Sequence, residues 1–369
     1  MSSFLDESLT GGCQPMRPQL SSSARALTTF FTQALASFRA TSSKFEVICT
    51  VPQSSVDTRE NDGRPTLPRP LPPRTRPSTL VILDSSFNPP TRAHLRMATS
   101  AIPPQAQEPE TSQPRQKDAE ETGGRAEAAR LLLLLSVNNA DKAPKPALFH
   151  HRLLLMWAFA QDVQSFLKKE DKPEISVDIG LLTLPFFHEK SEAIDQAEFY
   201  RHGSKEGRME QIMLVGYDTL IRVFNPKYYG PVMASESDGP LNTSIPTTKQ
   251  EETKTPMQMA LGPLFQRARL RVTMRTDDEW GGKDEQLRYL QSLICGDDNQ
   301  GGAPGLGRIG GSKEWAGRIE MVEGRQAGSE VISSTYARAA AKDGDEERLE
   351  RMVSDRVRCW IEEESLYQE

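Results

Sequence analysis

The side chains best suited to chemistry follow an apolar run that ends at Asp84, in the stretch LVILDSSFNPPTRAHLRMA. The two prolines of SSFNPP disfavour a helix before Thr91, which is a good N-cap residue, so we expect a helix to begin there. His94 follows three residues later, on the same face of that helix. An imidazole, a hydroxyl and the free N–H groups of a helix end would then converge, which favours phosphate binding. The alternative interpretation is a turn followed by a surface histidine.

A second group of polar residues lies near the end of the chain, in VISSTYARAA. Ser333, Ser334 and Thr335 offer hydroxyls at an expected helix start, and Arg338 lies one turn further along. A polyanion at this helix end would meet hydroxyls, amides and a guanidinium together. The alternative interpretation is an ordinary helix cap followed by a surface arginine.

Short apolar runs that alternate with amphipathic segments would position both groups. We expect strands at 79–84, 131–137, 175–178, 211–215, 270–274 and 318–322. We expect helices around 30–38 and at 91–101, 147–166, 191–202, 218–224, 335–341 and 346–364. This alternation predicts an α/β fold: a Rossmann-like, doubly wound parallel sheet with helices on both faces, plus long disordered insertions and an N-terminal helix. Ligands of such sheets bind beyond the C-terminal ends of the strands.

Composition predicts how the chain is divided. Residues 1–52 are expected to form an N-terminal helical extension and 53–78 a Pro-rich linker, followed by one domain over 79–369. Low-complexity insertions near 103–124, 234–255 and 296–311 interrupt that domain. These insertions and the linker are expected to be poorly ordered, because they bury little apolar surface against the entropic cost of ordering.

Charge and hydropathy exclude several classes of function. The net charge of −6 gives no basic surface for nucleic acid, and no apolar run approaches the roughly 20 residues that span a membrane. The N-terminus lacks the pattern of a secretory signal. The cysteines are far apart, which predicts reduced thiols, no structural zinc and a cytoplasmic or nuclear protein; they are Cys13, Cys49, Cys295 and Cys359.

Together the two polar groups resemble the motifs of a known family. SFNPPTxxH (86–94) and ISSTxxR (332–338) are similar to the signature motifs of the nucleotidylyltransferase superfamily, specifically of nicotinamide mononucleotide adenylyltransferases. IMLVGYDTLIRVF (212–224) resembles the G-x-D segment of that family, and VNNADKAPKPALFHHR (137–152) resembles its lysine-bearing loop. VGYDTLIRVFNPKYY looks closest to divergent fungal members. The resemblance covers most of 80–229 and 317–341.

The resemblance implies a reaction and a role for each residue. The enzyme would join the adenylyl group of ATP to nicotinamide mononucleotide, forming NAD and releasing pyrophosphate. The residues expected at the α-phosphate are Ser85, Ser86, Phe87, Thr91 and His94. Those expected at the β- and γ-phosphates are Ser333, Ser334, Thr335 and Arg338. Those expected elsewhere are Lys142 at the mononucleotide phosphate, with Lys145 beside it, and Gly216 and Asp218 at the adenosine ribose. Mg²⁺ is expected to enter bound to the ATP phosphates.

Several points stay open in the sequence. Ser85 stands where the family usually has glycine, close to the nucleotide phosphate, which bears on catalytic efficiency rather than on the fold. Phe186 and Phe187 could stack on a nicotinamide ring, although a buried aromatic pair is expected. The same fold could use another acceptor, such as phosphopantetheine or, with CTP, phosphocholine. A non-catalytic nucleotide-binding scaffold is a further alternative. Oligomeric state and the choice between nicotinamide and nicotinate are not determined.

Overall fold

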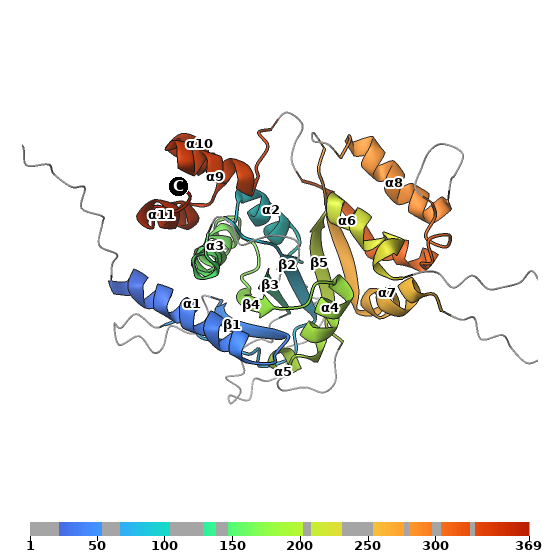
Figure 1. Ribbon diagram of the computed structural model, residues 1–369, viewed down its shortest axis with the longest axis horizontal. Coiled ribbons are helices and arrows are strands. Elements are labelled where there is room, and N and C mark those ends of the chain that lie inside the picture. The colour runs from blue at the N-terminus through green and yellow to red at the C-terminus, as the bar shows by residue number, and fades with distance from the viewer. Residues whose placement is uncertain are drawn as a thin grey trace, which may run out of the picture.

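A computed structural model describes residues 22–53, 67–103, 128–137, 147–201, 208–230, 254–276, 280–296, 304–324 and 329–368 (Figure 1). Its strands are β1 (Phe45–Val51), β2 (Thr79–Asp84), β3 (Ala129–Ser136), β4 (Ser176–Leu182), β5 (Glu210–Gly216), β6 (Ala268–Met274) and β7 (Ile319–Glu323). Its α-helices are α1 (Ser22–Ala40), α2 (Arg92–Ser100), α3 (Phe149–Lys169), α4 (Phe187–Gln196), α5 (Glu198–Arg201), α6 (Tyr217–Val223), α7 (Pro256–Arg267), α8 (Lys283–Cys295), α9 (Ser334–Asp343), α10 (Glu346–Met352) and α11 (Asp355–Glu363). Short 3₁₀ helices are η1 (Pro226–Tyr228) and η3 (Lys313–Arg318).

The described strands form one seven-stranded sheet in the order β1-β4-β3-β2-β5-β6-β7. Every neighbouring pair is parallel except β1 and β4, which are antiparallel. The chain begins the parallel part at β2, moves outward to β3 and β4, and then crosses to β5 on the other side of β2. Strand order therefore reverses between β2 and β5, which is where sheets of this class bind ligands. The predicted α/β doubly wound fold is confirmed.

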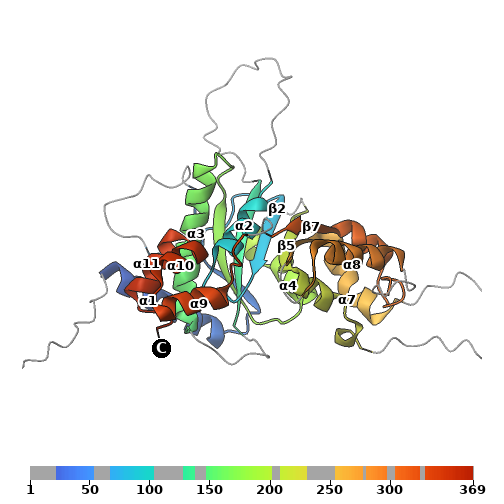
Figure 2. The same ribbon diagram turned by 90° about the horizontal axis from the view of Figure 1, so that it is seen from above.

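Both faces of the sheet are covered, which explains why its central strands read as continuous apolar runs. Alternate side chains of each strand enter different cores. Those on one face pack beneath α1, α2, α3 and α9–α11, and include Val81, Leu83, Leu131 and Leu133. Those on the other face pack beneath α4–α8, and include Leu80, Ile82, Leu132 and Leu134. Figure 2 shows these two groups of helices on opposite sides of the sheet.

The N-terminal segment differs from the predicted helical extension. α1 is present, but β1 follows it and joins the sheet, pairing with β4 from Phe45 opposite Leu182 to Val51 opposite Val177. Phe31 and Phe38 of α1 are buried in the same core as the residues of α3. Residues 22–51 are therefore packed as part of the α/β domain, because an antiparallel edge strand needs β4 as its partner.

Two predicted helices are each divided in the structure. The segment 191–202 is split at Ala197, whose extended backbone separates α4 from α5. The segment 346–364 is split at Val353 and Ser354, where Ser354 is the N-cap of α11. The apolar residues that recur at helical spacing in this segment are nevertheless buried: Leu349, Met352, Val353, Val357 and Ile361. The helical spacing continued through the break because Val353 also enters the core. The helices α7 and α8 were not predicted.

Parts of two predicted insertions are ordered, contrary to expectation. Residues 69–71 lie beside β1, where Arg69 O accepts from Thr50 N–H at 2.9 Å, and Arg76 is ion-paired with Asp195 of α4 at 2.6 Å. Residues 304–311 are held by Leu306, which is fully buried. The Pro-rich segment can lie beside an edge strand because proline has no N–H group that would need a hydrogen-bond partner. Most of the insertions at 103–124 and 234–255 lies outside the described residues.

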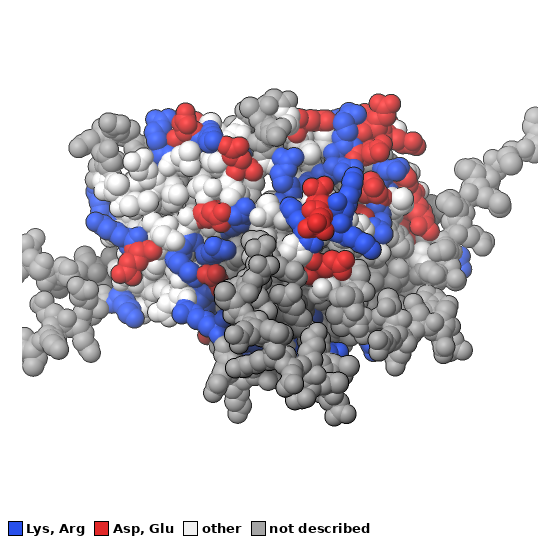
Figure 3. Space-filling view, turned by 180° about the vertical axis from the view of Figure 1, so that it is seen from behind, with Lys and Arg blue, Asp and Glu red and all other residues white. Residues whose placement is uncertain are grey.

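The surface of the described residues carries both signs of charge. Basic and acidic side chains are interspersed on the face seen in Figure 3. Exposed ion pairs contribute to this mixture, among them Arg351 with Glu330 and Arg358 with Glu362. Of the helices that the structure describes, none is long and apolar enough to cross a membrane.

Candidate active site

The loop after β2 carries the first predicted group to the C-terminal edge of the sheet. Residues 85–91, termed here the β2–α2 loop, join β2 to α2, and Thr91 is the N-cap of α2 with extended backbone. His94 occupies the third helical position, where its Nδ1 accepts from Thr91 N–H at 3.0 Å. This contact resembles a capping box in which histidine replaces the usual Glu or Gln. The helix start therefore fixes the orientation of the imidazole.

The hydrogen bonds of His94 define its tautomer. Because Nδ1 accepts from a backbone N–H group, the ring proton is on Nε2, which lies 2.9 Å from Ser85 Oγ. Thr91 Oγ1 lies 2.9 Å from Nδ1 on the other side of the ring. Burial lowers the pKa of His94 to about 4, so the ring is neutral near pH 7. The site therefore presents a neutral imidazole whose Nε2–H points to Ser85.

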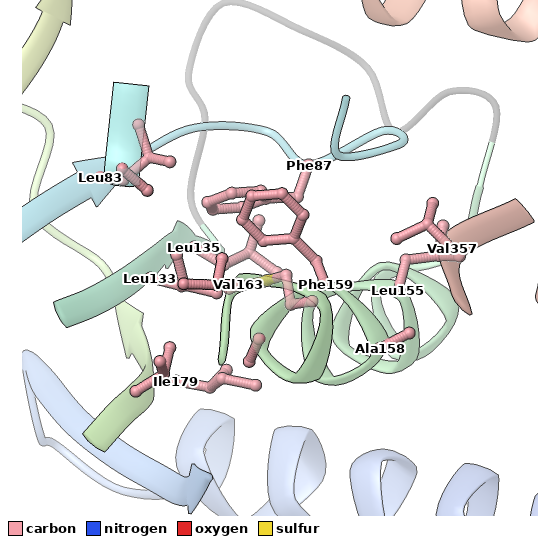
Figure 4. Close-up of a cluster of buried hydrophobic side chains, with 14 of the residues drawn as sticks. Leu83, Phe87, Leu133, Leu135, Leu155, Ala158, Phe159, Val163, Ile179 and Val357 are labelled. Carbon is pink, nitrogen blue, oxygen red and sulfur yellow. The ribbon is translucent and has the colours of Figure 1, made fainter. Parts of the chain in front are cut away.

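Phe87 anchors the β2–α2 loop in the core (Figure 4). Its side chain is fully buried, with ring centroids 6.4 Å from Phe159 of α3 and 5.6 Å from His94. Its φ angle of 44° is in the left-handed region, which costs a residue other than glycine on the order of 1 kcal/mol or more. The surrounding contacts must offset this strain to keep the loop in its present conformation.

The second predicted group contacts the same loop. Ser333 is the N-cap of α9 and accepts from Tyr336 N–H at 3.2 Å. Ser334 Oγ donates to Pro89 O at 2.8 Å, and Arg338 Nη1 donates to Asn88 O at 2.7 Å. Arg338 Nη2 also donates to Thr335 Oγ1 at 3.2 Å. The structure thus brings together two segments about 250 residues apart in sequence, and it places the start of α9 beside the start of α2.

The predicted ribose residues lie at the end of the neighbouring strand. Gly216 is the last residue of β5, and Asp218 is in the first turn of α6. Asp218 is ion-paired with Arg222 and, at 3.5 Å, with Arg275. A Cβ atom at Gly216 would lie 2.7 Å from Asp218 Oδ1, so a larger residue would displace this carboxylate. A ribose hydroxyl at Asp218 would compete with these two guanidiniums.

The predicted mononucleotide lysines, Lys142 and Lys145, lie outside the described residues. The helix that follows them, α3, places Arg152 near the site. Its Nε donates to Ala147 O at 3.0 Å. Burial lowers the pKa of Arg152, and the nearby Arg338 lowers it further. Arg152 is thus near enough to Tyr367 and Arg338 to interact with both electrostatically.

A buried ion pair at the strand ends was not predicted from the sequence. Lys190 of α4 pairs with Asp84 at the end of β2, and its Nζ also donates to Ser136 Oγ of β3 at 3.3 Å. The two charged side chains are 8% and 13% exposed. Asp84 could have been found as the polar end of an apolar strand. Lys190 has no comparable signal, because its position depends on how α4 packs.

The aromatic residues before Lys190 depart from expectation. Phe187 packs beneath Lys190, with the ammonium 5.4 Å from its ring centroid. Phe186 is 41% exposed and stacks on His188 at an interplanar angle of 11°. The expected buried aromatic pair is therefore wrong for Phe186, because α4 begins at the next residue and turns the Phe186 ring outward from the core.

Comparison with known proteins gives one informative match. No family model matches the chain. A curated protein of Schizosaccharomyces pombe (strain 972) bears the provisional name nicotinamide mononucleotide adenylyltransferase, and it is 27% identical over 278 residues. The match spans 75% of this chain and 82% of that protein. The predicted family resemblance is confirmed. This similarity to a nicotinamide mononucleotide adenylyltransferase also supports the predicted nucleotidyltransferase class of enzyme.

Solved structures similar to this chain include two of nicotinic acid mononucleotide adenylyltransferase from Plasmodium falciparum. The complex with NaAD has a TM-score of 0.40 and 11% identity, over 79% of this chain and 97% of that chain. The complex with APC has a TM-score of 0.38 and 10% identity, with the same coverage. At these TM-scores neither likeness adds to the assignment of fold or function.

Proposed function

We propose that this protein transfers the adenylyl group of ATP to nicotinamide mononucleotide, forming NAD and releasing pyrophosphate. The observation that carries the proposal is the junction of the β2–α2 loop with the start of α9 at the C-terminal edge of the sheet. There the N–H group of a neutral His94, two helix N-termini and Arg338 lie together. The similarity to the S. pombe protein supports the choice of acceptor.

In the proposed reaction His94 acts on the α-phosphate of ATP. A phosphate oxygen of the mononucleotide attacks the α-phosphorus in line, and the bond from that phosphorus to the oxygen bridging to the β-phosphate breaks. The electron pair of the broken bond leaves with pyrophosphate. His94 Nε2–H donates to a non-bridging α-phosphate oxygen, taking that oxygen in place of Ser85 Oγ, and so stabilises charge in the transition state. No protein nucleophile is required, because positioning and charge neutralisation supply the catalysis.

The start of α9 would hold the leaving group. Ser333, Ser334 and Thr335 supply hydroxyl and backbone N–H groups at the positive end of the helix, and Arg338 supplies a guanidinium. These groups suit the β- and γ-phosphates, which are charged before and after the reaction. Arg152 adds a second guanidinium near Arg338. Lys142 would neutralise the phosphate of the mononucleotide.

Mg²⁺ is proposed to enter with ATP, held mainly by phosphate oxygens. Within the described part of the chain, no three His, Cys, Asp or Glu side chains gather as metal ligands. The ion would neutralise phosphate charge while the protein orients the two substrates.

The test is turnover by the purified full-length chain with Mg²⁺-ATP and one acceptor at a time. We expect NAD and pyrophosphate with nicotinamide mononucleotide, measured by chromatography. Product with nicotinate mononucleotide alone would keep the reaction but change the acceptor. Pyrophosphate release with phosphopantetheine as the only effective acceptor would overturn the assignment of a pyridine mononucleotide as the acceptor. Binding of ATP without pyrophosphate release in the presence of any acceptor would favour the alternative of a non-catalytic nucleotide-binding scaffold.

A further inference from the structure

The chain turns back toward the β2–α2 loop immediately after α11. Leu366 N–H donates to Ile361 O at 2.9 Å and Ser365 N–H to Glu362 O at 3.2 Å, which is the hydrogen-bond pattern of a Schellman motif. Ser365 takes the left-handed position, with a φ angle of 51°. Ile361 is buried in the core that contains α3 and Leu366 packs against the same core, the two positions that are typically apolar in this motif. Figure 1 shows this end of the chain beside α9, α10 and α11.

This turn delivers Tyr367 to the loop. Tyr367 OH donates to Asn88 Oδ1 at 2.9 Å, although the two residues are 279 positions apart in sequence. The ring packs against the same core as Leu366, and the φ angle of Tyr367 is 70°, also left-handed. Two non-glycine residues in the left-handed region, separated only by Leu366, cost free energy, so contacts must hold the segment in place.

Asn88 is consequently held from two sides. Arg338 donates to its backbone oxygen and Tyr367 to its side-chain oxygen. Asn88 is only 5% exposed and directly follows Phe87, the residue with strained backbone. Burial raises the pKa of the Tyr367 phenol, while the neighbouring guanidiniums of Arg152 and Arg338 act in the opposite direction. The phenol therefore stays protonated near pH 7 and remains a hydrogen-bond donor.

We propose that Tyr367 is a positioning residue of the adenylyl-transfer site. Through Asn88 it keeps the β2–α2 loop in the conformation that presents His94 and the loop amides to the α-phosphate. The inference rests on the proposed function. Tyr367 touches no reacting atom; it acts by restricting a strained loop whose geometry decides how well the transition state is held.

The first experiment removes only the phenolic hydroxyl. Tyr367→Phe should lower kcat about fivefold, the rate equivalent of roughly one hydrogen bond, while the Kd for ATP changes less than about twofold. Its melting temperature should stay within a few degrees of the wild type. Tyr289→Phe is the matched control, because this half-buried phenol lies on α8 at the opposite face of the sheet. Equal kcat for Tyr367→Phe and the wild type would overturn the proposal.

The second experiment asks whether Tyr367 acts through Asn88. In an Asn88→Ala background, Tyr367→Phe should cost no further activity, since the acceptor of its hydrogen bond is already absent. A full fivefold loss of kcat in that background would contradict the proposal. If Asn88→Ala does not fold, Asn88→Asp keeps an acceptor oxygen, and there Tyr367→Phe should retain its cost. If Tyr367→Phe does not lower kcat in the Asn88→Asp background, the proposal would also be overturned.

The third experiment changes the turn and leaves both partners in place. Ser365→Gly should keep or raise kcat, because glycine favours the left-handed position. Ser365→Val should lower kcat, because a β-branched residue disfavours that position. Similar kcat values for these two variants would contradict the inferred role of the turn.

A readout independent of activity separates this inference from the proposed function. Amide hydrogen exchange in residues 85–91 should be faster in Tyr367→Phe than in the wild type or in Tyr289→Phe. Faster exchange in a protein that makes no NAD would defeat the proposed function while supporting the contact between Tyr367 and the loop. If the wild type forms NAD but Tyr367→Phe changes neither the exchange of the loop nor kcat, the proposed function would stand and the role of Tyr367 would be overturned.

Discussion

Ser85 Oγ lies 2.9 Å from Nε2 of His94, so the serine hydroxyl accepts a hydrogen bond from Nε2–H. In the proposed reaction the same N–H group donates to the α-phosphate of ATP. The hydroxyl thus occupies the direction from which a phosphate oxygen would approach. A glycine at this position would leave the proton of Nε2 exposed to the substrate. Ser85 therefore satisfies His94 in the free protein, and ATP must replace that contact to be bound productively.

Replacement of His94 should separate catalysis from binding. His94→Ala is expected to lower kcat by on the order of 10²–10³, because it removes one donor to the charge that develops in the transition state. The Kd for ATP should change only modestly. Steady-state kinetics and equilibrium ATP binding check this outcome, with Ser100→Ala at the exposed end of α2 as the control. Near wild-type kcat in a normally folded His94→Ala variant would exclude His94 from the proposed catalytic role and leave it the structural role of capping α2.

Removal of the Ser85 hydroxyl should strengthen ATP binding. Ser85→Ala leaves Nε2–H of His94 without its partner, so the free protein loses a contact that the ATP complex does not need. One hydrogen bond contributes about 1 kcal/mol, which predicts a Kd for ATP lower by roughly fivefold. Calorimetric titration measures this change. Weaker binding would instead mean that Ser85 itself contacts the nucleotide.

Arg338 should affect both kinetic constants, unlike His94. Its proposed target phosphates are charged in the ground state, so Arg338→Ala should raise KM for ATP and also lower kcat. The same change removes the guanidinium that donates to Asn88 O. Arg351→Ala is the matched control, since Arg351 forms an exposed ion pair with Glu330. A rise in KM of similar size in both variants would indicate a general charge effect.

The ion pair of Lys190 with Asp84 should stabilise the strand ends. Lys190→Met would leave a poorly hydrated carboxylate beside the proposed phosphate site, with an expected loss of on the order of 3 kcal/mol of unfolding free energy. Denaturant titration measures it. The double variant Lys190→Met with Asp84→Asn should recover most of the loss. Lys283→Met breaks an exposed pair with Glu323 and should lower the unfolding free energy far less. Equal losses for the two lysines would contradict the burial of Lys190.

Stability should fall as pH decreases from about 6.5 to about 4. Burial lowers the folded-state pKa of His94 to about 4, and burial with the charge of His150 lowers that of His151 to about 4. Because the unfolded imidazoles titrate near 6.5, the unfolded state binds protons across this window that the folded state does not, which favours unfolding. His94→Gln should weaken this pH dependence, as measured by denaturant midpoints between pH 7.5 and 4.5. If the denaturant midpoint of His94→Gln depends on pH as steeply as that of the wild type, groups other than His94 cause the loss of stability.

The sequence predicted those features that depend on local patterns. β2 was found with its bounds because its apolar run ends at a loop with two prolines, and His94 was found from its spacing to the N-cap Thr91. The contacts of Tyr367 and Lys190 were not predicted from the sequence. Their partners, Asn88 and Asp84, are 279 and 106 residues away. Only the packed fold brings such pairs together.

The Pro-rich segment beside β1 has a consequence for solubility. β1 is an edge strand, and an edge strand exposes backbone groups that a second chain can pair with. Here Arg69 O already accepts from Thr50 N–H, and Leu71 N–H donates to Thr50 Oγ1 at 3.0 Å. The prolines of this segment have no N–H group to extend a ladder outward. The segment thus ends the sheet at β1 and opposes edge-to-edge aggregation of separate molecules.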